Sequence, residues 1–236
     1  GLDLSERTPD PERLLKIYDF AKNLYAERNK LASAGYSELY SYEQTDKDTS
    51  QFLENLCKKM SQTQFDNNFE PLFFSHEALH LPFEQAMTRR YEHFSTYLNV
   101  STHFLWLGYR TAFLDSAHVE YLRGLENPIG IKIGPLSKLE TVFQIASALT
   151  LKDQKPGKVS FILRYGKTEC EKKTIEFCKK YKSSNIKGLI IADISHGNTF
   201  KDKYGRKRRN IEDMIQEAKI VNSILEEHDL KLHGLH

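Results

Sequence analysis

The sequence predicts an α/β protein of the (β/α)8 TIM-barrel type, with about four βα units in this chain and an extra helical segment before them. Two observations support this prediction. From about residue 101, short apolar stretches alternate with longer stretches in which apolar residues recur at helical spacing. The apolar stretches are rich in β-branched or aromatic residues, as expected of buried parallel strands. Because four strands cannot close a barrel alone, we expect this chain to form part of one.

Residues 1–100 are predicted to be a mainly helical segment. Apolar residues occur at helical spacing in residues 11–34, and Pro11 stands near the start of this pattern, where proline is favoured. Two further helices are predicted, although Pro82 should kink or interrupt the second of them. These helices are expected at 48–60 and 75–90. No strand is supported in this segment.

Residues 101–236 are predicted to form the partial βα-barrel. Each predicted strand is short and apolar, and each is followed by a helical pattern. The strands are expected at 103–108, 128–133, 159–164 and 188–193. The helices are expected at 111–124, 137–149, 168–183 and 210–228.

Composition excludes several classes of function. Lys and Arg number 34 and Asp and Glu 32, and this net charge of +2 creates no global field toward nucleic acid or anionic lipid. No apolar run approaches the roughly 18 residues that span a bilayer. Cys57, Cys170 and Cys178 lie on predicted helices without a ligand partner, so we expect reduced, packed thiols and a cytosolic setting. The first residues lack signal-peptide character, and the missing initiator Met indicates a fragment or a trimmed chain.

Charged or small residues stand at the carboxyl ends of all four predicted strands. In a barrel these positions would meet at one rim, where three cations could bind a phosphate or carboxylate. A single strand-end arginine is usually solvated or ion-paired, and a single Gly-Pro is merely a turn. Because such residues stand at the ends of four successive predicted strands, a functional site is the favoured interpretation. The residues are Arg110, Lys132 with Gly134 and Pro135, Arg164, and Asp193 with His196.

His196 follows Asp193 at the end of the last predicted strand. A metal ligand or a general base is plausible there, because imidazole is available near neutral pH. The alternative is a hydrogen-bonded loop histidine, and the position of His196 taken by itself favours this alternative.

Glu77 and Glu84 are seven residues apart on one predicted helix and would share a face. Two carboxylates can perform acid–base chemistry. They are more often a polar stripe on a helix.

The run Lys201–Arg209 contains six cations and one aspartate. It resembles a nucleic-acid patch or a localisation signal. In a nearly neutral chain, a phosphate-handling or solvated loop is the better interpretation, and we expect no nucleic-acid partner.

These motifs together resemble class II 3-deoxy-D-arabino-heptulosonate 7-phosphate (DAHP) synthase, the first enzyme of the shikimate pathway. The similar segments occur in the family's order and with similar spacing along nearly the whole chain. They are Ser75-His-Glu-Ala-Leu, Trp106-Leu-Gly-Tyr-Arg-Thr, Asp115-Ser-Ala-His-Val-Glu, Asn127-Pro-Ile-Gly-Ile-Lys-Ile-Gly-Pro, Arg164-Tyr-Gly and Asp193-Ile-Ser-His-Gly-Asn-Thr.

The resemblance implies a transferase of aromatic amino acid and chorismate biosynthesis that condenses phosphoenolpyruvate with erythrose 4-phosphate. It also implies a (β/α)8 barrel and a divalent metal such as Mn²⁺ or Co²⁺. The helices at 11–34 and 48–60 resemble the insertion by which family members bind an aromatic amino acid effector. We further expect a homo-oligomer without a membrane partner, located in the cytoplasm, or in the plastid if the source is a plant.

The resemblance also implies roles for individual residues. Lys132, Arg164 and His196 would be catalytic, with His196 as a metal ligand. The substrate-binding residues would be Glu77, Trp106, Arg110, Lys132, Gly134, Pro135 and Arg164 for phosphoenolpyruvate, with Lys207 and Arg209 near the sugar phosphate.

Some positions depart from the family pattern. Tyr109 stands where the family has Glu, and Asp-Ile-Ser-His replaces Asp-Pro-Met-His. The family's Cys ligand upstream and its Glu and Asp ligands downstream are not among these 236 residues. We therefore expect the isolated chain to be inactive, and a degenerate, non-catalytic homologue or fragment that binds a phosphate ligand or regulates a partner remains the alternative.

Overall fold

A computed structural model describes residues 10–34, 73–91, 96–150 and 157–236. The chain divides into two compact units, residues 1–72 and 73–236, and each is described by itself.

The described part of the first unit is helix α1, Pro11–Ala34, which confirms the helix predicted there. Asp10 precedes the helix, and its carboxylate accepts a hydrogen bond from the Glu12 backbone N–H at 3.0 Å. This contact satisfies one of the free N–H groups at the helix start. The predicted helix at 48–60 lies outside the described residues.

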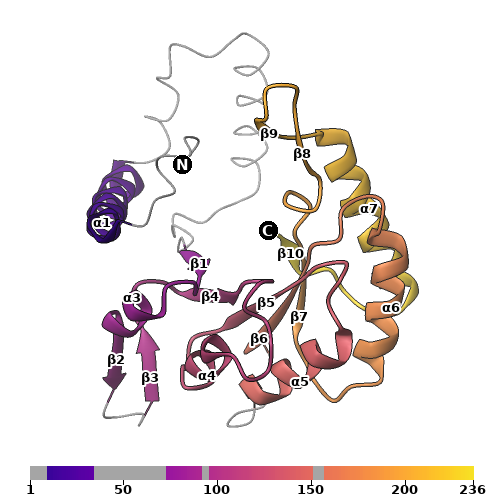
Figure 1. Ribbon diagram of the computed structural model, residues 1–236, viewed down its shortest axis with the longest axis horizontal. Helices are drawn as coiled ribbons and strands as arrows, with labels where there is room; N and C mark the ends of the chain where they lie inside the picture. Colours follow the sequence, from indigo (N-terminus) through magenta and orange to yellow (C-terminus); the bar gives the residue numbers. More distant parts are fainter. Residues whose placement is uncertain (1–9, 35–72, 92–95, 151–156) are drawn as a thin grey trace. The chain divides into compact units, whose positions relative to one another are not determined.

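The second unit is built around a six-stranded sheet in which every neighbouring pair is parallel (Figure 1). The strand order is β1-β4-β5-β6-β7-β10. The strands are β1 (Ser75–Glu77), β4 (Phe104–Leu107), β5 (Ile129–Ile133), β6 (Val159–Leu163), β7 (Leu189–Ala192) and β10 (Gly234–Leu235). This arrangement is compatible with part of a TIM-type barrel.

Four helices follow strands β4 to β7 in turn and lie along one side of the sheet (Figure 1). They are α4 (Ala117–Arg123), α5 (Leu139–Thr150), α6 (Cys170–Lys182) and α7 (Ile211–Glu227). A short helix and two small antiparallel sheets complete the unit. These are α3 (Leu81–Ala86), the pair β2 (Thr88–Tyr91) and β3 (Thr96–Asn99), and the pair β8 (Thr199–Lys201) and β9 (Lys207–Arg209).

The central strands lie in the hydrophobic core. All five residues of β5 and all five of β6 are buried, as expected when helices cover a parallel sheet. Phe161 of β6 stacks on Phe143 of α5 with ring centroids 5.0 Å apart and meets Phe177 of α6 at 5.4 Å. These aromatic contacts fix α5 and α6 against the sheet.

The four strands predicted at 103–108, 128–133, 159–164 and 188–193 are confirmed as β4 to β7. The prediction of one helix over 75–90 was wrong. Residues 75–77 form β1, which pairs with β4, and only Leu81–Ala86 is helical. Pro82 lies in the first turn of α3, where its missing N–H removes no helical hydrogen bond, so it starts a helix instead of interrupting one.

Two further expectations need correction. The region before residue 101 does contain strands, namely β1, β2 and β3. The helix expected at 111–124 begins only at Ala117, because the Ser116 side chain caps it by accepting from the Val119 N–H at 3.1 Å.

Of the helices in the described ranges, none has the length and apolar character needed to cross a membrane.

Candidate active site

The strand-end residues predicted from sequence lie at one edge of the sheet. Lys132 is the fourth residue of β5, Arg164 directly follows β6, and His196 lies four residues beyond β7. Arg110 follows β4 by three residues. Because β4, β5, β6 and β7 are parallel neighbours in that order, their carboxyl ends meet at the same edge.

Two of the predicted residues share a carboxylate. Lys132 Nζ donates to Asp193 Oδ2 at 2.8 Å, and His196 Nδ1 lies 2.9 Å from both Asp193 oxygens. Oδ1 of Asp193 also accepts the backbone N–H of His196 at 3.1 Å. Asp193 is fully buried and thereby joins the end of β5 to the loop after β7.

The charge state of Asp193 follows from these contacts. Burial by itself raises the pKa of this carboxyl, but hydrogen bonds from Lys132 and His196 outweigh it and lower the pKa to about 2. The carboxylate is therefore ionised at neutral pH and balances the buried Lys132 ammonium.

His236 extends this cluster from the neighbouring strand. It follows β10, and its backbone N–H donates to the Ala192 carbonyl at 2.9 Å, so its ring lies beside the end of β7. His236 Nδ1 is 3.8 Å from Asp193 Oδ2, and the ring meets Trp106 edge-on at 4.8 Å between centroids. Burial and the nearby Lys132 charge lower the pKa of His236, which favours the neutral imidazole that metals bind.

Asp193, His196 and His236 could together hold a metal ion. One potential ligand atom from each residue lies within 4.8 Å of the others. Two imidazoles and a carboxylate suit divalent transition metals, so the donor set fits the predicted cofactor. The bond from His196 Nδ1 to Asp193 leaves Nε2 of that ring for a metal and fixes its orientation.

Trp106 and Glu77 are register partners on β4 and β1, next to this cluster. Lys132 Nζ lies 5.1 Å from the centre of the Trp106 ring. The indole Nε1 is buried and has no hydrogen-bond partner among the described residues. A buried donor without a partner is costly, so an acceptor group on a ligand would stabilise it.

The sequence model of the class-II DAHP synthetase family matches residues 1–236. The chain belongs to this family. A phospho-2-dehydro-3-deoxyheptonate aldolase of Streptomyces coelicolor is 32% identical over 238 residues, which cover 93% of this chain and 52% of the relative. A protein of the same name from Neurospora crassa is 29% identical over 269 residues, covering 100% of this chain and 56% of the relative. The chain spans about half the length of these relatives.

A plant protein is similar over a shorter region. A probable chloroplastic phospho-2-dehydro-3-deoxyheptonate aldolase of Catharanthus roseus is 33% identical over 153 residues, which cover 65% of this chain and 31% of the relative.

Tyr109 occupies the position at which the sequence departs from the class-II DAHP synthetase pattern. Its ring lies against Gly134, where an added Cβ would be 3.0 Å from Tyr109 Cε2. Gly108 similarly lies against the carboxylate of Glu77, whose Oε1 would be 1.9 Å from a Cβ at this position. A side chain larger than glycine at either position would therefore displace the Glu77 carboxylate or the Tyr109 ring, and Pro135 directly follows Gly134.

The remaining predicted residues are less tightly held. Arg110 is exposed and Arg164 half-buried, and neither makes a side-chain hydrogen bond to another described residue. Lys207 and Arg209 are exposed on β9, and Arg209 Nε donates to the Ser195 carbonyl at 3.0 Å.

A buried glutamate links the two rim loops that follow β6 and β7. Glu217 of α7 accepts the Gly166 N–H at 2.9 Å and the Asn198 side-chain amide at 2.5 Å. Asn198 Oδ1 in turn accepts the Lys167 N–H at 2.9 Å. Burial raises the pKa of Glu217, although these hydrogen bonds partly offset the effect. The loops carrying Arg164 and His196 are therefore held by the same helix.

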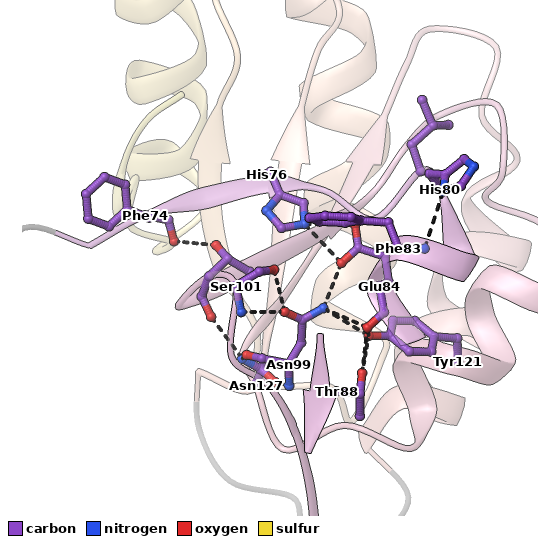
Figure 2. A network of polar contacts seen from close by, with 12 residues as sticks. Phe74, His76, His80, Phe83, Glu84, Thr88, Asn99, Ser101, Tyr121 and Asn127 are labelled. Carbon is purple, nitrogen blue, oxygen red and sulfur yellow. Dashed lines mark hydrogen bonds and ion pairs between the residues drawn. The ribbon is translucent and has the colours of Figure 1, made fainter. Parts of the chain in front are cut away.

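A second buried network surrounds Glu84, the residue that sequence paired with Glu77 (Figure 2). The two glutamates do not share a helix, because Glu77 lies on β1 and Glu84 on α3. The Glu84 carboxylate bonds His76 Nε2 at 2.9 Å and the Asn99 amide at 2.7 Å. Its carbonyl accepts the hydroxyl of Tyr121 at 3.1 Å. This network connects β1, α3, β3 and α4, which indicates a structural role for Glu84.

Sequence reasoning missed His236 and noted Asp193 only as a strand end. His236 follows a two-residue strand, too short to give a periodic signal. The available signal was its place after α7, where the alternating pattern calls for another strand.

Proposed function

We propose that the full-length protein is a DAHP synthase that condenses phosphoenolpyruvate with erythrose 4-phosphate. The observation that carries the proposal is the Asp193-centred cluster of Lys132 and His196 in a chain matched along its whole length by the class-II family. The reaction joins the enol carbon of phosphoenolpyruvate to the aldehyde carbon. Water then adds at C2, and inorganic phosphate leaves.

Phosphoenolpyruvate would bind at the carboxyl ends of β4, β5 and β6. Lys132 offers a buried ammonium, and the indole N–H of Trp106 is a second donor directed to no described residue. An anionic oxygen would give the indole N–H a partner and would accept a further N–H of the Lys132 ammonium, which already binds Asp193. Arg110 and Arg164 would add bidentate contacts from neighbouring strands, while Gly134 and Pro135 shape the turn and Glu77 lines the pocket.

A divalent metal, Mn²⁺ or Co²⁺ by the family resemblance, would supply Lewis acidity for the aldehyde when bound. In this chain His196, Asp193 and His236 would hold it. Asp193 would also orient Lys132 and His196 relative to each other, so that the substrate's phosphate and carboxylate meet a fixed charge pattern. Lys207 and Arg209 would bind the sugar phosphate.

The names of the relatives favour an enzyme over a non-catalytic homologue. The bulky Tyr109 beside Gly134 is the feature that supports the alternative. An aromatic amino acid effector, a homo-oligomeric state and a cytoplasmic or plastid location stay predictions.

The test is a phosphate-release assay on the full-length protein. We expect activity that needs both substrates, disappears with a chelator, and returns when a divalent metal is added. Lys132→Ala and Arg164→Ala should each weaken phosphoenolpyruvate binding measured by calorimetry. Activity that survives both chelation and His196→Ala would overturn the metal assignment, and absence of activity in the metal-loaded protein would favour the non-catalytic homologue.

A further inference from the structure

A pocket of about 360 Å³ lies beside the antiparallel pair β2 and β3, and we call it the hairpin pocket. Its volume is at the lower end of the range for sites that bind small molecules. The pocket is formed within residues 73–236, so it differs from the predicted effector-binding helices at 11–34 and 48–60. The lining residues are Leu81 and Gln85 of α3, Thr88 and Tyr97 of the paired strands, Tyr121 of α4, and Leu125 after α4.

The walls of the hairpin pocket are mostly apolar and aromatic, and hydrogen bonds hold them in place. Tyr97 forms a backbone bridge with Leu125, which joins β3 to the end of α4. Thr88 Oγ1 and the Tyr121 hydroxyl are 2.8 Å apart, and both donate to the Glu84 carbonyl (Figure 2). The hydroxyls therefore fix the Tyr121 ring and leave a preformed space bordered by two tyrosines, which favours an aromatic group.

Arg90 places a positive charge beside this pocket. It pairs with Tyr97 in the register of β2 and β3 and lies two residues after Thr88, so its side chain shares a face with both. Arg90 is exposed, and none of the described residues pairs with its guanidinium. Arg89 lies on the opposite face, where its Nη1 donates to the Ala86 and Thr88 carbonyls at 2.7 and 2.9 Å. Arg90 can therefore donate two parallel hydrogen bonds to an anion at the pocket.

We propose that the hairpin pocket binds a small aromatic carboxylate, with its ring against Tyr97 and Tyr121 and its carboxylate on Arg90. An aromatic ring packs on tyrosine rings in offset-stacked or edge-on arrangements. A carboxylate matches the planar guanidinium through paired hydrogen bonds. An uncharged ring would leave Arg90 without a partner, and an inorganic anion would leave the apolar walls uncovered. A molecule that carries both groups satisfies both parts of the pocket.

The charge contact is tested on the full-length protein with 3-phenylpropanoate and its uncharged counterpart 3-phenylpropanamide. Ligand-observed NMR titrations measure both Kd values. We expect the carboxylate to bind about tenfold more tightly than the amide, as for one charge-assisted interaction. Arg90→Gln should abolish this preference. Arg89→Gln removes the same charge from the neighbouring residue and should leave the Kd of 3-phenylpropanoate within about twofold of the wild-type value.

The aromatic wall is tested with Tyr97→Ala, and Val100→Ala is the matched control outside the pocket. Tyr97 is 47% and Val100 46% exposed, so the fold should tolerate either truncation, and thermal unfolding checks this. We expect Tyr97→Ala to raise the Kd of both probes by roughly fivefold, because the ring contact is lost. Val100→Ala should change neither Kd.

The outcomes are separable from the proposed function, because none of these titrations needs catalytic activity. Equal Kd values for the two probes, or equal effects of Arg90→Gln and Arg89→Gln, would overturn the role of Arg90. If 3-phenylpropanoate binding is insensitive to Tyr97→Ala, the probe binds elsewhere, such as at the cations of the strand ends, and the inference fails. It also fails if the wild-type protein shows no saturable binding at millimolar probe, as expected if a second copy of the chain covers the pocket.

Discussion

Lys132 on β5 and Asp193 after β7 form a buried ion pair of 2.8 Å between residues 61 positions apart in the chain. Their side chains are 9% and 0% exposed. The pair crosses over β6, because β5, β6 and β7 are consecutive in the sheet. The order of the strands therefore brings the two residues together, and the ion pair holds the Lys132 ammonium where it would bind substrate.

The first prediction concerns this pair. Asp193→Asn should lower the free energy of unfolding by about 3–5 kcal/mol, because it leaves the Lys132 ammonium buried without its counter-ion. Urea denaturation of the full-length protein measures the effect. Asp213→Asn is the control, since Asp213 pairs with Lys167 at 2.7 Å where both side chains are at least one-third exposed. Asp213→Asn should lower the free energy of unfolding by less than about 1 kcal/mol. An equal decrease in both variants would show that the buried ion pair stabilises the fold no more than the exposed one does.

The sequence was sufficient to predict the central strands and their charged ends. Strands β5 and β6 consist mostly of apolar residues and are buried along their whole length, so they are recognisable without any partner. Once they are placed, Lys132 and Arg164 follow as rim residues. The prediction of His196 at the same edge rests on the same logic.

The edge strands could not be predicted in this way. The three residues of β1 are Ser-His-Glu, whose polar character gives no strand signal, and the strand exists because it pairs with Phe104–Trp106. The two residues of β10 are specified by pairing with β7. Such non-local pairing overrides local propensity, and it is what places Glu77 and His236 beside Trp106.

The second prediction concerns the contact between the two rim loops. Gly166 has φ +78°, and a Cβ there would lie 2.7 Å from the Gly197 carbonyl oxygen. Gly205 has φ +75° with open space around it. Gly205→Ala should therefore lower the free energy of unfolding by only about 1–2 kcal/mol, which is the cost of holding an alanine in the left-handed backbone conformation. Gly166→Ala should lower the free energy of unfolding by about 1–3 kcal/mol more than Gly205→Ala does, because the added methyl group would push the loops after β6 and β7 apart.

Thermal unfolding and phosphoenolpyruvate affinity of the two glycine variants check this prediction. Only Gly166→Ala should weaken phosphoenolpyruvate binding, since it displaces the loop that begins at Arg164. Indistinguishable melting temperatures and affinities would contradict the close packing of the loops.

The third prediction concerns the buried thiols of α6. Burial raises the pKa of Cys170 and of Cys178 to about 11 each. The thiolate is the reactive form, so iodoacetamide should modify both residues very slowly at pH 8 in the native protein, and faster by about tenfold per pH unit up to the pKa. Peptide mass mapping distinguishes these cysteines from others. In denaturant at pH 8 both should react fully; rapid native labelling would contradict their burial.

The fourth prediction concerns Glu217, which holds both rim loops. In Glu217→Gln one acceptor oxygen becomes an amide donor, so either the Gly166 N–H or the Asn198 amide loses its partner. We expect a cost of about 1–3 kcal/mol and a lower affinity for phosphoenolpyruvate and metal. Glu227→Gln at the exposed end of α7 is the control, and it should change neither the stability nor these two affinities.

The pH dependence of stability gives this glutamate a distinct signature. Because burial raises the pKa of Glu217 in the folded protein, the folded state binds the proton more tightly than the unfolded chain does. Its stabilising contribution is fully present below the ordinary carboxyl pKa of 4.5 and is lost as the pH rises through the folded-state value. The stability difference between wild type and Glu217→Gln should therefore be largest at acidic pH and narrow toward neutrality. Urea titrations across this range measure the difference, and a gap that widens with rising pH would mean that Glu217 is instead stabilised as the anion.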